Sequence, residues 1–188
     1  MVAPLDNSRL VRAAGIRRVE ELDWWQETNA FGPLAITLTP AQHFSARTPF
    51  DRNRALWGGF VIGVNGRRVF FAGDSGYGPH FRDVRQRCGP VDLALLPIGA
   101  YEPRWFMKDV HMNPAEAVQV HLDLEAEQTI GMHFGTFRLT AEGISDPVAA
   151  LHEALRSRDV PGSRFRTLEP GDSLKLIQGK SPDCRLGM

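Results

Sequence analysis

GFVIGVNGRRVFFAGD, residues 59–74, is the stretch of sequence that decides the fold. Its two apolar runs are separated by Asn65-Gly66, a dipeptide that is the strongest short-range signal for a β-hairpin. We therefore expect antiparallel strands over residues 60–64 and 69–72. Asp74 follows the second strand directly, and the glycines at 73 and 76 allow the backbone around it to turn tightly and to lie close to other segments.

Further strands are expected on both sides of this hairpin. LAITLTP, residues 34–40, is apolar and β-branched up to a proline, which is typical of a strand. VDLALLPIG, residues 91–99, is continuously apolar and predicts a strand covered on both faces. Residues 127–133 predict a strand that ends at His133. The tail from residue 164 to 176 predicts a strand, a Pro-Gly turn and a second strand.

Helices are expected between these strands. Residues 80–88 form a short helical candidate. Asn113 is an expected N-cap, and the helix over residues 114–123 follows it, with a buried side formed by Ala117, Val118 and Leu122. A further helix is expected over 147–157, and a short helix followed by a strand within the first 30 residues. Alternating strands and helices after a hairpin indicate a mixed α/β layered domain.

Composition restricts the class of protein. With 188 residues, 43% of them hydrophobic, the chain fits one domain over residues 1–188. Lysine plus arginine equals aspartate plus glutamate, 22 each, so we expect no nucleic-acid partner. Cys88 and Cys184 show no CxxC spacing, which argues against a disulfide scaffold or a thiolate zinc site and favours a reducing cytoplasm. No stretch is apolar for long enough to span a membrane.

Three polar side chains stand at the ends of predicted strands: His43, Asp74 and His133. Because ligands of layered α/β folds bind beyond the strand ends, these three groups could converge. Imidazole nitrogens and carboxylate oxygens are the usual ligands of zinc and related ions, and one aspartate can bridge two ions. The pattern therefore favours a metal site in which Asp74 can bridge two ions.

Each of these residues also has a plain structural alternative. A histidine at a strand end is often only a hydrogen-bonded polar group, and Asp74 could simply initiate a turn. His111, directly before the helix N-cap, is a fourth candidate whose alternative is a loop residue bonded to backbone. His121 and His152 lie inside predicted helices and are interpreted as structural, and His80 is expected to open a helix.

Other chemistries fit less well. Ser75 lies in G-D-S-G rather than in the G-x-S-x-G nucleophile elbow, and neither a Walker motif nor a dinucleotide-binding glycine fingerprint is present. The aromatic side chains are numerous enough to line a groove for an acyl chain or another apolar substrate, although such residues mostly build cores: Trp24, Trp25, Trp57, Trp105 and Phe106.

Several strings together resemble one known family. The chain is similar to the C-terminal part of the N-acylphosphatidylethanolamine phospholipase D group, within the metallo-β-lactamase superfamily. The strings that carry the resemblance occur in order and cover nearly the whole chain: ELDWWQE (21–27), TPAQHFSART (39–48), LWGGFVI (56–62), FFAGDSGY (70–77), LLPIGAYEPRWFMKDVHMNPAEAV (95–118) and MHFGTF (132–137).

The resemblance implies an αββα sandwich with a two-metal centre, usually zinc, at one rim. It implies that His43 completes the ligand set of one metal, that Asp74 bridges both metals and that His133 binds the second. It also implies that His111 is an active-site histidine that binds no metal and lies near the scissile phosphate. The implied reaction is phosphodiester hydrolysis, in which a bridging hydroxide attacks phosphorus.

The sequence departs from this family in one respect. Family members carry an earlier H-x-H-x-D-H motif that supplies four of the seven usual ligands, and residues 1–188 contain no such motif. The expectation is a truncated domain that holds one or two zinc ions. Because half of a layered core would leave apolar surface exposed, we expect a homodimer or a partner chain that supplies the motif.

Two functions remain open at this point. The first is a metal-dependent, phospholipase D-like phosphodiesterase, cytoplasmic or peripheral to a membrane, that acts on a small-molecule or lipid phosphodiester such as an N-acyl phospholipid, with Asp74 and His111 as catalytic residues. The alternative is a non-catalytic remnant or a partner-dependent subunit that binds a ligand without turnover.

Overall fold

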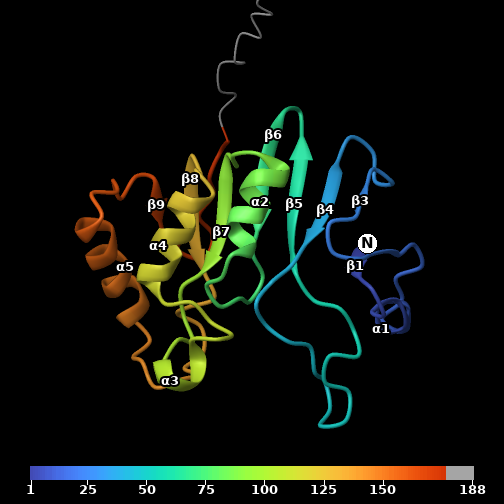
Figure 1. Ribbon diagram of the computed structural model, residues 1–188, viewed down its shortest axis with the longest axis horizontal. Helices are drawn as coiled ribbons and strands as arrows, with labels where there is room; N and C mark the ends of the chain where they lie inside the picture. The colour runs from blue at the N-terminus through green and yellow to red at the C-terminus, as the bar shows by residue number, and fades with distance from the viewer. Residues whose placement is uncertain (177–188) are drawn as a thin grey trace, which may run out of the picture.

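Seven strands form one mixed β-sheet (Figure 1). The computed structural model describes residues 1–176. In spatial order the strands are β3 (Glu27–Thr28), β4 (Ala35–Thr39), β5 (Gly59–Val64), β6 (Arg67–Phe71), β7 (Leu93–Pro97), β8 (Gln128–Met132) and β9 (Phe165–Arg166). Neighbours are antiparallel from β3 to β6 and parallel from β6 to β9. The carboxyl ends of β4, β6, β7 and β8 therefore lie at the same edge of the sheet.

The hairpin predicted at residues 59–74 is confirmed. Strands β5 and β6 pair in antiparallel register from Phe60 opposite Phe71 to Val64 opposite Arg67. Asn65 and Gly66 form the turn with φ angles of 49° and 75°. Two positive φ angles in a two-residue loop are what the Asn-Gly signal predicts, because this backbone twist matches that of the flanking strands.

Three helices pack against one face of this sheet (Figure 1): α2 (His80–Cys88), α4 (Pro114–Asp123) and α5 (Asp146–Ser157). The rings of Phe70 on β6 and Phe81 on α2 meet edge to face, with centroids 6.2 Å apart. Both rings belong to the buried apolar cluster, together with Leu96, Leu151 and Phe165. This cluster supplies most of the hydrophobic stabilisation and fixes the helices over the parallel strands.

Helix α4 begins where the sequence predicts. The Asn113 side chain accepts a hydrogen bond from the Glu116 N–H at 2.8 Å, and the Glu116 carboxylate accepts one from the Asn113 N–H at 2.8 Å. Ala117 is buried as predicted, but Leu122 is 41% exposed, so its predicted burial is wrong. The Leu122 side chain points away from the buried face of the helix. His121 lies on that buried face, where its Nδ1 atom is 2.8 Å from Thr129 Oγ1.

Two strand predictions are also wrong. Ala94 and Leu96 of β7 are fully buried, whereas Leu93 and Leu95 are partly exposed, so this strand is not covered on both faces. The reason is that α2, α4 and α5 lie on the face to which Ala94 and Leu96 point. In the tail, residues 167–176 contain no second strand after β9.

The N-terminal segment agrees with the predicted helix and strand and adds short elements that were not predicted. α1 (Ser8–Ala13) precedes β2 (Glu20–Leu22), and β1 (Val2–Pro4) pairs with β2 in parallel. The Asn7 amide ties this unit to the loop before β5 by donating to the Leu56 carbonyl at 3.0 Å. Helix α3 (Arg104–Met107) is a single turn. Within residues 1–176 no helix has the length and apolar character needed to cross a bilayer.

Candidate metal centre

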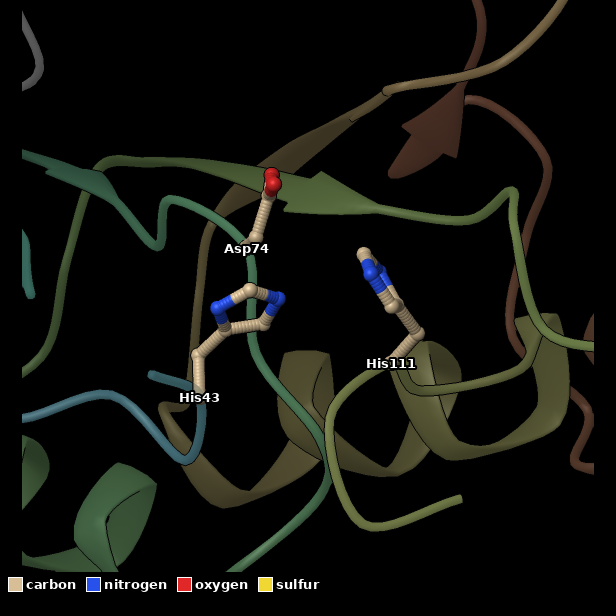
Figure 2. Close-up of side chains that lie close together, drawn as sticks. All are labelled: His43, Asp74 and His111. Atoms are coloured by element: carbon tan, nitrogen blue, oxygen red, sulfur yellow. The ribbon is translucent and has the colours of Figure 1, made fainter. Parts of the chain in front are cut away.

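The candidate ligands come together at the edge of the sheet where β4, β6 and β8 end. His43 follows β4, Asp74 follows β6, and His111 lies just before α4. Donor atoms of these three side chains all lie within 4.8 Å of one another. Figure 2 shows the three side chains arising from separate segments of the chain. His133, directly after β8, places its Nε2 atom 3.6 Å from Asp74 Oδ1.

The ring of His111 lies between those of the other two histidines. Its centroid is 5.1 Å from that of His43, at nearly a right angle, and 5.3 Å from that of His133, in a stacked arrangement. All four residues selected from the sequence therefore share one site. The group of three donors within 4.8 Å of one another contains His111 and not His133. The resemblance instead selects His133 as the ligand, so the division of roles between these two residues stays a prediction.

His43 is oriented by its neighbour. Its Nδ1 atom lies 2.9 Å from the Phe44 carbonyl oxygen, to which an Nδ1–H donates, and its ring stacks on the Phe44 ring. An imidazole that donates through Nδ1 keeps the lone pair of Nε2 free for a cation. The guanidinium of Arg52 covers the same Phe44 ring at 4.1 Å from its centroid.

The glycines around Asp74 act as the sequence predicts. Gly73 has φ +65°, a conformation that side-chain-bearing residues rarely adopt. At Gly76 a Cβ atom would lie 2.9 Å from the carbonyl carbon of Asp109. The chain therefore bends on one side of Asp74 and packs tightly against the loop before His111 on the other.

Ser75 connects the loops that carry the candidate ligands. Its side chain is fully buried, and its Oγ accepts from the Gln42 N–H at 3.0 Å and donates to the Gly76 carbonyl at 2.8 Å. Its own carbonyl accepts from the Met112 N–H at 3.0 Å. Gln42, Ser75 and Met112 each adjoin one of the three donors. Sequence reasoning considered Ser75 only as a nucleophile, and its buried position explains why G-D-S-G is instead a structural junction.

His111 is held by its backbone. Its N–H donates to the Met107 carbonyl at 2.8 Å, and its carbonyl accepts from Arg104 at 2.9 Å. Arg104 also forms a two-pronged ion pair with Glu116, at 2.9 and 3.0 Å. No pattern in the sequence indicated Arg104. Burial, reinforced by nearby His43, lowers the pKa of His111 to about 4, so its ring is neutral at neutral pH.

The residues present fit a divalent cation. The Nδ1 atoms of His111 and His133 are buried and have no hydrogen-bond partner within the described part of the chain. Buried polar atoms are rarely left unpaired without a reason, and a role as a metal ligand is one such reason. Imidazole nitrogens and one carboxylate are donors that suit zinc, iron and related ions.

The site opens into a cavity of about 740 Å³. Arg52 contributes a positive charge to its wall and Glu102 a carboxylate. The remaining wall is largely apolar and is formed by Phe44, Phe106, Met107, Val110 and Leu139, besides shorter side chains. The cavity can therefore hold a molecule with both an anionic and an apolar part.

The aromatic residues considered for a groove do not gather at this cavity. Of the five aromatic residues proposed, Phe106 alone lines this cavity. Trp24 Nε1 donates to the Trp57 carbonyl at 2.6 Å, and Trp57 Nε1 donates to the Ala41 carbonyl at 2.9 Å. These two indoles thus fix the segment before His43. Tertiary hydrogen bonding of this kind has no signature in a single sequence.

A mixed sheet with helices on one face and imidazole and carboxylate donors beyond its strand ends is an arrangement typical of metal-dependent α/β proteins. Residues 2–134 match the model of the family described as the beta-lactamase superfamily domain. The chain belongs to this family, the metallo-β-lactamase superfamily, as its motifs indicate.

Two relatives of this chain within the superfamily share one description. N-acyl-phosphatidylethanolamine-hydrolyzing phospholipase D 1 of Caenorhabditis elegans is 40% identical over 169 residues, which cover 86% of this chain and 47% of the relative. The mitochondrial enzyme of the same description from Saccharomyces cerevisiae is 36% identical, over 78% of this chain and 32% of the relative. The chain thus spans half or less of the length of these relatives.

A solved structure supports the fold. Isothiocyanate hydrolase from Delia radicum gut bacteria superposes with a TM-score of 0.68 at 17% identity, covering 93% of this chain and 67% of that one. At this identity the likeness concerns the fold alone. It confirms the layered α/β architecture of this superfamily that was expected from the sequence.

Proposed function

We propose that this protein is a zinc-dependent phosphodiesterase of the phospholipase D-like kind, which acts on N-acyl phospholipids or related lipid phosphodiesters. The observation that carries the proposal is the group formed by His43, Asp74 and His111, whose donor atoms lie within 4.8 Å of one another at the mouth of a partly apolar cavity. The described activity of the relatives supports the substrate class.

Each residue of the site has a task in this proposal. His43, Asp74 and His133 would hold the cation, which supplies Lewis-acid activation of the phosphoryl group and of water. Arg52 lies on the cavity wall, where its guanidinium can bind a phosphate oxygen. The neutral ring of His111 can exchange a proton with the reacting groups. The apolar wall can hold part of an acyl chain.

The test combines metal analysis with a simple substrate. We expect the purified chain to retain one or two zinc ions per molecule and to hydrolyse bis-p-nitrophenyl phosphate, with activity lost on chelation and restored by zinc. Less than one ion per chain together with no hydrolysis would contradict the proposal and would favour a non-catalytic remnant or a subunit that needs a partner. We also propose that the protein is cytoplasmic and contacts membranes peripherally.

A second copy of the chain is the partner that we propose for the open sheet face. Ile62, Val69 and Leu93 are cross-strand neighbours on the face away from α2, and all three are partly exposed. Phe71, on the same face, is 38% exposed. Apolar side chains in adjacent rows of strands form a surface that association would remove from water.

Light scattering checks this dimer. We expect a dimeric mass at micromolar concentration, and a monomer after Phe71→Glu, because a charge cannot be buried without a partner. Glu20→Gln, an exposed change on the separate two-stranded sheet, should leave the dimer intact. A compact monomer of the unaltered chain at high concentration would contradict the prediction.

A further inference from the structure

A second hollow lies at the opposite end of the sheet from the candidate metal centre. It has a volume of about 380 Å³ and is lined by Trp25, Glu27, Ala35, Thr37, Val61, Gly63, Arg68, Arg87 and Cys88. Ala35 begins β4 and Arg68 is the second residue of β6, whereas His43 and Asp74 follow the other ends of these strands. The strands thus separate this hollow, here called the Trp25 hollow, from the metal centre.

The floor of the Trp25 hollow is built from small side chains. Gly63 pairs with Ala35 on one side and with Arg68 on the other, and Thr37 pairs with Val61 in the next row. Larger β-strand residues at 35 and 63 would fill this space. Helix α2 ends at Cys88, so this part of the sheet lies beyond its last turn.

One wall of the Trp25 hollow is Trp25 itself, whose backbone has a strained conformation that contacts hold in place. Trp25 has a φ of +69°, which is rare for a bulky side chain. Its N–H donates to the Leu38 carbonyl at 2.7 Å, and the Arg87 guanidinium lies 4.5 Å from the centre of its ring. Backbone strain of this kind is concentrated at binding sites, where it orients a side chain in advance.

The charges of the hollow are unbalanced. Arg68 and Arg87 form no ion pair within residues 1–176, whereas the Glu27 carboxylate accepts a hydrogen bond from the Thr37 hydroxyl at 3.2 Å. Two guanidinium groups and one carboxylate leave an excess positive charge. Guanidinium groups bind carboxylates and phosphates through paired hydrogen bonds, and an indole face packs against a planar apolar group.

We infer that the Trp25 hollow is a second binding site, separate from the metal centre, for a small planar organic anion such as an aromatic carboxylate or an aromatic phosphate. The anionic group is bound by Arg68 and Arg87, and the ring lies against Trp25 over the floor formed by Ala35 and Gly63. This inference does not depend on the proposed hydrolase activity.

Calorimetric titration of the full chain with 2-naphthoate and with 2-naphthyl phosphate tests the inference. We expect at least one of them to bind, and the neutral 2-naphthamide to bind at least about tenfold more weakly. The double change Arg68→Gln with Arg87→Gln should weaken the anion by about tenfold or more. Arg82→Gln is the matched control, since Arg82 is also an exposed arginine of α2 but pairs with Asp123.

Cys88 gives an independent readout. Its thiol is half-buried in the wall, and burial raises its pKa. A bound anion should slow its alkylation by iodoacetamide, followed by mass spectrometry of the peptide that contains Cys88. The bound probe should protect Cys88 in the parent and in Arg82→Gln but not in the double variant, provided that circular dichroism shows all three to be folded.

Three results would overturn the inference. Equal affinity for naphthoate and naphthamide would mean that no charge is recognised. Binding that survives the double change but disappears in Asp74→Asn would place the anion at the metal centre. Absence of binding of both anions at millimolar concentration, with Cys88 unprotected, would mean that the hollow is not a site for this class of ligand.

Discussion

Replacing Asp74 by asparagine is expected to lower zinc affinity by about 100-fold or more, the largest loss of any single change at the site. Asp74 is the one carboxylate among the four candidate ligands, and its oxygen lies 3.6 Å from His133 Nε2 and close to His43 and His111. Even residues that only orient metal ligands contribute about 10–100-fold to metal affinity, so a direct charged ligand should exceed this range.

Competition with a zinc-binding dye measures this loss, and circular dichroism checks that the variant is folded. Asparagine keeps the shape of the side chain and removes its charge, so the comparison isolates the carboxylate. Asp83→Asn is the control, because Asp83 is an exposed carboxylate on α2 away from the site. Equal zinc content in Asp74→Asn and the parent would remove Asp74 from the ligand set.

The elements that could be predicted are those specified by local chemistry. Asn65-Gly66 requires two positive φ angles, and Asn113 with Glu116 forms a reciprocal cap, so a turn and a helix start follow from a few adjacent residues. Three of the four candidate site residues, His43, Asp74 and His133, were selected by a related argument, whereas His111 precedes a helix and was not. Side chains placed just after strands that run in the same direction must lie at one edge of the sheet.

The features that were missed depend on contacts between distant segments. Ser75 is a junction because Gln42 and Met112, far from it in sequence, donate to it. Leu93 and Leu95 are partly exposed because the helices lie on one face, which an apolar run does not reveal. Neither the burial of a serine nor the face on which helices pack has a periodic signature in one sequence.

Changing His111 to glutamine is expected to reduce the rate of phosphodiester hydrolysis by about 10²–10⁴-fold while zinc content stays near that of the parent. This range is typical of the loss of a group that transfers a proton in the transition state. His111 is buried and its Nδ1 atom has no partner among residues 1–176. Arg104 and Met107 hold its backbone, so glutamine should occupy the same place without being able to exchange a proton.

Measuring kcat and zinc content together separates the two roles that the geometry allows for His111. His133→Gln should lose zinc and activity in parallel, because His133 is the predicted ligand. His152→Gln, on the exposed side of α5, should change neither. If His111→Gln instead loses zinc as His133→Gln does, His111 is a ligand, and the tight group that it forms with His43 and Asp74 is the first coordination sphere itself. The proton transfer would then have to come from another group on the wall of the cavity, where Glu102 is the remaining carboxylate.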